Sequence, residues 1–108
     1  MPSKYGGQEM LTISDKFAGY AKYLFPEESP ESRFEKLIEN ELIRRLSRYR
    51  NTQKILESKY KMDFETFKAN NILKKEEYSF DVENDFCDWE MAIDGIQTME
   101  RKLKDLRG

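Results

Sequence analysis

The sequence predicts an all-α protein built on a long antiparallel helical hairpin. Two stretches, Pro30–Tyr60 and residues 81–106, carry apolar side chains at helical spacing. From Leu42 onward the first stretch has a heptad-like seam, which is typical of a long helix that packs along another. Such a helix is about 45 Å long, more than the width of a 108-residue globule, so it needs an equally long partner.

Charge is segregated between the two stretches. Residues 33–61 carry nine basic and four acidic side chains, whereas residues 76–100 carry nine acidic and no basic ones. Two antiparallel helices with these charges would attract each other along their flanks. The whole chain has a net charge of −2, which disfavours a general affinity for nucleic acid.

Residues 1–28 form an N-terminal arm before the hairpin domain of residues 29–108. We expect residues 1–10 to be poorly ordered and a short helix to begin after Ser14 and end before Pro26. This arm contains four aromatic candidates for partner binding: Phe17, Tyr20, Tyr23 and Phe25. They either pack on the hairpin or bind a partner protein.

The first long helix begins with a strong start signal. Ser29 suits the N-cap and Pro30 the first helical position. Its middle holds a basic patch: Arg44, Arg45, Arg48 and Arg50. These arginines either pair with carboxylates of the opposite helix or contact the phosphates of a nucleic acid.

The bend is expected to contain a short helix after the N-cap Asp63, over residues 64–69. Six apolar residues around it are predicted to plug the closed end of the hairpin: Phe64, Phe67, Ile72, Leu73, Tyr78 and Phe80.

The second long helix is capped by Ser79 or Asp81. Its predicted apolar stripe consists of Val82, Phe86, Trp89, Ile93, Ile96, Leu103 and Leu106. Ala92 and Met99 are expected at the edge of this stripe, and Gly95 suggests a close approach of the two helices.

The chain contains little that favours catalysis. It has no histidine, no glycine-rich phosphate loop and a single cysteine, Cys87, which has no histidine to activate it. An acidic group opens the second helix: Asp81, Glu83, Asp85, Asp88 and Glu90. These carboxylates either face the helix dipole and a basic neighbour or bind a divalent metal. We expect no enzymatic activity, no cofactor and no metal.

Two further features bear on location. A lone cysteine cannot form an intrachain disulfide, which favours a reducing compartment, and no apolar run approaches membrane-spanning length. We therefore expect a cytoplasmic protein without a membrane segment.

Three segments resemble a group of short prokaryotic proteins. They are KYKMDFETF at 59–67, SFDVENDFCDWE at 79–90 and DGI at 94–96. The resembling proteins accompany putative toxins of the TumE type and are regarded as antitoxin-like. The resemblance implies a toxin–antitoxin role and a small toxin as partner, and it carries over no catalytic residue.

These observations predict a non-enzymatic protein-binding partner whose hairpin forms a homodimer, a bundle of helices, because one hairpin leaves apolar surface uncovered. The predicted binding residues are the four arm aromatics and the five carboxylates of the second helix. The alternative is a nucleic-acid-binding module that uses the arginine patch.

Overall fold

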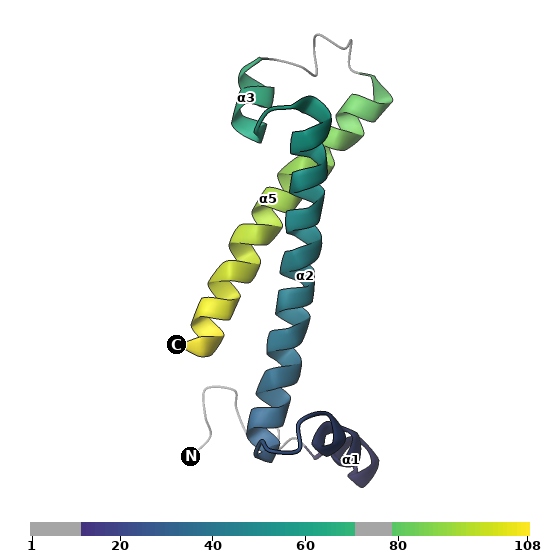
Figure 1. Ribbon diagram of the computed structural model, residues 1–108, viewed down its shortest axis with the longest axis vertical. Helices are drawn as coiled ribbons and strands as arrows, with labels where there is room; N and C mark the ends of the chain where they lie inside the picture. The colour runs from purple at the N-terminus through teal and green to yellow at the C-terminus, as the bar shows by residue number, and fades with distance from the viewer. Residues whose placement is uncertain (1–11, 71–78) are drawn as a thin grey trace. The chain divides into compact units, whose positions relative to one another are not determined.

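The computed structural model describes residues 12–70 and 79–108 of the chain. These residues form four helices and no strand: α1 (Asp15–Leu24), α2 (Pro30–Tyr60), α3 (Phe64–Ala69) and α5 (Phe80–Arg107) (Figure 1). The predicted all-α class and the two long helices are confirmed. The expected disorder of residues 1–10 concerns a segment outside the described residues.

The chain divides into two compact units, Met1–Leu37 and Ile38–Gly108. The first contains α1 and the start of α2, and the second contains the rest of α2 with α3 and α5. The division falls within a continuous helix. The boundary expected between residues 28 and 29 stays a prediction.

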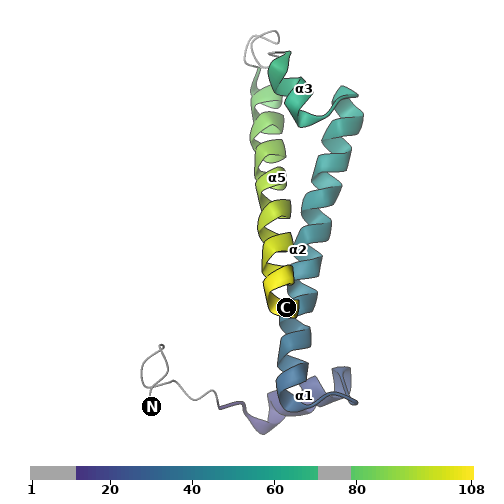
Figure 2. The ribbon, with the colours of Figure 1, turned by 90° about the vertical axis from the view of Figure 1, so that its left-hand side faces the viewer.

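In the second unit α2 and α5 run antiparallel side by side, with α3 at the closed end of the hairpin (Figures 1 and 2). The short helix begins where the Asp63 carboxylate accepts a hydrogen bond from the Thr66 N–H at 2.8 Å. The Ser79 hydroxyl caps α5 by accepting from the Val82 N–H at 3.3 Å. Ser79 is therefore the cap and Asp81 is not; α5 begins at Phe80, one residue earlier than expected.

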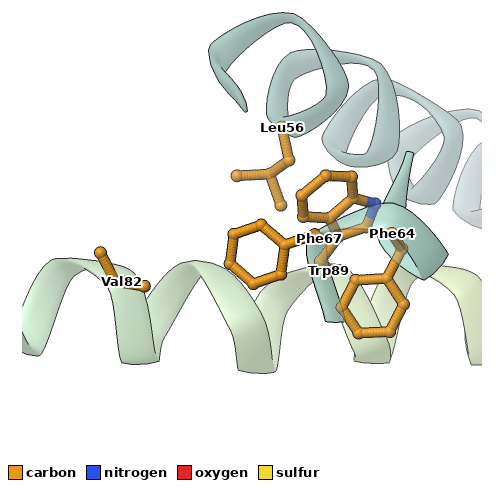
Figure 3. Close-up of a cluster of buried hydrophobic side chains, with 5 residues drawn as sticks. All are labelled: Leu56, Phe64, Phe67, Val82 and Trp89. Atoms are coloured by element: carbon orange, nitrogen blue, oxygen red, sulfur yellow. The ribbon is translucent and has the colours of Figure 1, made fainter. Parts of the chain in front are cut away.

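The main hydrophobic core lies at the closed end and combines all three helices of this unit. Its buried members are Leu56, Phe64, Phe67, Val82 and Trp89. Trp89 is 0 % exposed, and its indole contacts the rings of Phe64 and Phe67 at centroid distances of 5.3 and 5.1 Å. Figure 3 shows these two α3 side chains beside the indole, which comes from α5. The short helix thus completes the core that holds the hairpin closed.

A second core cluster lies further along the hairpin and consists of Leu46, Met99 and Leu103. Here the prediction for α5 was wrong in detail, because Ala92 and Met99 are buried whereas Ile93 and Ile96 are only half-buried. A helix that packs along another buries two rows of side chains, three or four residues apart. Ala92 and Met99 belong to the second of these rows and so lie in the seam rather than at its edge.

The prediction that Phe80 helps to plug the closed end of the hairpin was also wrong. Its side chain is 75 % exposed and takes no part in the core. Two residues along a helix correspond to about 200° of rotation, so Phe80 and the buried Val82 lie on nearly opposite faces of α5. The other predicted plug residues Ile72, Leu73 and Tyr78 lie outside the described part of the chain.

Gly95 marks the predicted close approach of the two long helices. A Cβ atom at this position would lie 2.6 Å from ring carbons of Tyr49 on α2. Such a distance is shorter than van der Waals contact permits, so the ring occupies the space that only glycine leaves. The sequence prediction of a close approach is confirmed.

In the first unit, α1 begins as predicted. The Ser14 hydroxyl accepts a hydrogen bond from the Phe17 N–H at 3.3 Å, and the helix ends at Leu24, before Pro26. Ser29 caps α2 in the same way, accepting from the Ser32 N–H at 3.2 Å. No residue of α1 is buried, so this helix contributes no side chain to either core cluster.

Candidate protein-binding surfaces

The apolar face of α1 is open to solvent. Phe17, Tyr20 and Leu24 project from one side of the helix, because they are spaced by three and four residues. Each is more than half exposed; Phe17 reaches 65 %. Tyr23 lies beside this face and is the most exposed of the four predicted aromatics. An amphipathic helix with its apolar side uncovered is typical of a protein-binding segment.

Phe25 differs from the other three aromatics. It is half-buried and follows the last residue of α1, where its N–H donates to the Ala21 carbonyl at 2.9 Å. Its own carbonyl accepts a hydrogen bond from Arg33 Nε at 3.0 Å. Phe25 therefore takes part in the turn between α1 and α2, while Phe17, Tyr20 and Tyr23 are exposed on α1.

A groove of about 320 Å³ lies between α1 and the start of α2 within the first unit, and Phe17 of the apolar face lies at its border. It is lined by Ile13, Phe17, Ala18, Ala21, Pro30, Arg33, Phe34 and Leu37. The residues from α2 recur at three- and four-residue spacing, and no surface was predicted there. Their pattern alone is that of a core face. Only the structure shows that Phe34 and Leu37 are exposed.

The arginine patch is distributed among separate contacts. Arg44 and Arg45 both donate to the Glu41 carboxylate on their own helix, at 2.7–2.8 Å. These hydrogen bonds hold the pKa of Glu41 at about 2. Arg50 pairs across the hairpin with Glu100, and the Arg48 guanidinium lies 5.7 Å from the centroid of the Tyr49 ring. Three of the four arginines are thus already bound to carboxylates.

The five predicted carboxylates of α5 also separate into two groups. Asp85 is half-buried and accepts hydrogen bonds from Lys59 Nζ at 2.5 Å and from the Tyr60 hydroxyl at 2.6 Å. Asp81 is exposed and interacts with Lys59 through charge alone. Among the described residues, no hydrogen bond or ion pair engages Glu83, Asp88 or Glu90, which are exposed. Asp85 therefore links α5 to α2 within the hairpin, and the other four carboxylates are exposed.

The contacts of Asp85 predict a pH-dependent stability. Burial raises its pKa, but hydrogen bonds from Lys59 and Tyr60 outweigh this and bring the pKa below its ordinary value of 3.8. The carboxylate thus stabilises the fold above about pH 4, and this contribution is lost as the pH falls through the folded-state pKa. Asp85→Asn should lower the free energy of unfolding by about 1–2 kcal/mol near neutral pH.

The test compares urea unfolding of the wild type and Asp85→Asn between about pH 6 and pH 2.5. The difference should shrink toward zero in acid, where the wild-type carboxyl is also neutral. Tyr60→Phe, which removes one of the two hydrogen-bond donors to Asp85, should lower the free energy of unfolding by a smaller amount with the same dependence on pH. A difference that stays constant across this range would contradict the assignment.

Comparison with protein families, with curated proteins and with solved structures found no match to this chain. Nowhere in residues 12–70 and 79–108 do three histidine, cysteine or carboxylate side chains gather as a metal site would need. Within the same residues, no helix combines the length and apolar character that a membrane span requires.

Proposed function

We propose that the chain is a non-enzymatic protein-binding partner, the antitoxin-like component of a toxin–antitoxin module. The observation that carries this proposal is the uncovered apolar face of α1, where a ten-residue amphipathic helix buries none of its residues. A protein that leaves three large apolar side chains on one exposed face gains free energy when another surface covers them, at about 25 cal/mol per Å² of apolar area. The resemblance of residues 59–67, 79–90 and 94–96 to antitoxin-like proteins suggests what kind of partner this is.

In the proposed complex the aromatic face of α1 and the carboxylates of α5 bind different parts of the toxin. Phe17, Tyr20 and Tyr23 anchor the toxin through apolar burial, as aromatic side chains commonly do at the centre of interfaces. The outward carboxylates of α5 occupy a basic cleft of the toxin, of the kind that binds RNA, and thereby mask it. A homodimer in the cytoplasm belongs to the same proposal.

The alternative, a nucleic-acid-binding module, is less well supported. Arg44, Arg45 and Arg50 are paired with Glu41 and Glu100, so phosphate contact would have to replace these ion pairs. Binding to RNA or DNA that falls steeply with salt and is lost on replacing the four patch arginines would establish it in place of the toxin partner.

The proposal predicts that the chain neutralises the product of the gene adjacent to its own. Expression of that product alone should arrest growth of a bacterial host, and co-expression of this chain should restore it. The double variant Phe17→Ser/Tyr20→Ser should weaken the complex at least about tenfold, because both are proposed anchors and both side chains are exposed. Calorimetric titration of the purified proteins measures the affinity.

The matched control is Ile55→Ser on α2, since Ile55 is 56 % exposed but lies outside α1. It should leave both growth rescue and affinity unchanged. Circular dichroism should confirm that each variant keeps its helix content. A neighbouring product that is not toxic, or that does not bind this chain, would overturn the proposal.

A further inference from the structure

The outer face of α5 carries a stripe with two large apolar side chains, and no other described part of the chain covers it. Phe80 is 75 % exposed and Met91 is 63 % exposed, and Cys87 between them is also exposed. With Asn84 they follow a spacing of four, three and four residues, which places all four on one stripe. The buried Trp89 and Ala92 lie on the other side of the helix, so this stripe, the outer seam, faces away from the hairpin core.

Carboxylates border the outer seam on both sides. Asp81 and Asp88 form one row and Glu83 and Glu90 the other, since each pair is spaced by seven residues. Glu83, Asp88 and Glu90 form no hydrogen bond or ion pair with any other described residue. An apolar stripe between two charged rows is the arrangement by which coiled-coil helices choose their partners.

The negative charge beside the outer seam indicates which kind of molecule can bind there. If two copies of this chain paired through the outer seam alone, their carboxylate rows would face each other and repel. A nucleic acid would be repelled for the same reason. A helix with lysine or arginine beside its own apolar stripe would instead gain both apolar contact and complementary charge.

We propose that the outer seam of α5 docks an amphipathic helix of the partner protein, whose apolar stripe is flanked by basic residues. This inference rests on the proposed protein-binding function and names the chemistry of the segment that is bound. The anchor residues are Phe80 and Met91. Asp88 and Glu90 provide specificity, while Asp85 remains in the hairpin with Lys59 and Tyr60.

Three synthetic helical peptides test this proposal with the full chain. The first has a leucine stripe flanked by lysines, the second has the same stripe flanked by glutamates, and the third has the lysines but serines in place of the leucines. Fluorescence anisotropy should show binding of the first peptide at least about tenfold tighter than of either other peptide. Equal binding of the first and third would overturn the proposal, because charge alone would then account for it.

Variants of the chain locate the site. Phe80→Ser/Met91→Ser should weaken binding of the lysine-flanked peptide about tenfold or more, whereas the control Ile55→Ser, at a residue that is also more than half exposed, should not. Asp88→Lys/Glu90→Lys should reverse the preference in favour of the glutamate-flanked peptide. These side chains are exposed, so the hairpin should fold in every variant. An unchanged preference after charge reversal would contradict the proposal.

The outcome is independent of the toxin experiment. Specific binding of the lysine-flanked peptide without toxin neutralisation would support the outer seam and refute the antitoxin role. Toxin neutralisation that persists in Phe80→Ser/Met91→Ser, together with equal binding of all three peptides, would support the antitoxin role and refute the outer seam as a docking site. Light scattering of the free chain adds one check: a dimer that Met91→Ser dissociates would assign the outer seam to a second copy and overturn the proposal.

Discussion

Replacing Trp89 by alanine should lower the free energy of unfolding by about 3–5 kcal/mol. The indole is 0 % exposed and joins helices from both arms and the bend, since it contacts Tyr60 of α2 and Phe64 and Phe67 of α3. Alanine would leave a cavity that the three surrounding rings cannot fill without moving. A loss of this size is a large fraction of the stability of a small domain.

Trp89→Phe separates packing from hydrogen bonding. The buried indole N–H has no hydrogen-bond partner among the described residues, so phenylalanine removes a polar group that contributes nothing and keeps much of the apolar volume. Trp89→Phe should lower the free energy of unfolding by less than half as much as Trp89→Ala. Urea unfolding followed by far-UV circular dichroism measures both, because Trp89 is the only tryptophan and its fluorescence is lost. Equal losses would show that the N–H makes a stabilising hydrogen bond.

Gly95→Ala should destabilise the hairpin by about 1–3 kcal/mol, although alanine is the better helix former. The added Cβ would lie 2.6–2.7 Å from three ring carbons of Tyr49, and the rigid ring must swing away for it to fit. Movement of Tyr49 would disturb the second core cluster, against which this ring packs. Thermal unfolding of the variant measures the effect.

Gly19 in α1 provides the matched control. A Cβ atom built there meets nothing within 4 Å, so Gly19→Ala gains helix propensity of about 1 kcal/mol without a clash. It should slow amide hydrogen exchange in α1, which is the suitable measurement because α1 buries no side chain. Effects of the same sign at the two glycines would contradict the packing argument.

The helices and their ends follow from local sequence. Ser14, Ser29, Asp63 and Ser79 cap the four described helices, and each was recognised from its type and position before an apolar run. These signals act over three or four residues, so neighbouring sequence decides them. The start of α5 at Phe80 was missed by one residue because Asp81 is an equally good cap by type.

The burial of side chains was less predictable. Phe80 was predicted to lie in the core, yet it is exposed, and so are Phe34 and Leu37 in the apolar pattern of the first long helix. The same spacing serves a core and a docking surface equally well, because both need apolar groups on one side of a helix. The burial of Ala92 and Met99 was underestimated for a related reason. A seam between long helices has two rows of side chains, and periodicity alone does not say which row is more deeply buried.

The sequence by itself determined the class of fold, the extent of the helices and the opposite charges of the two arms. Only the tertiary structure decided which charges form ion pairs within the hairpin and which face solvent. Asp85 contacts Lys59 and Tyr60 across the two arms, which lie 26 and 25 positions away in the chain, whereas Asp88 and Glu90 on the same helix face outward. Contacts between distant residues depend on the rotation and register of one helix against the other, and close packing such as Tyr49 on Gly95 fixes these.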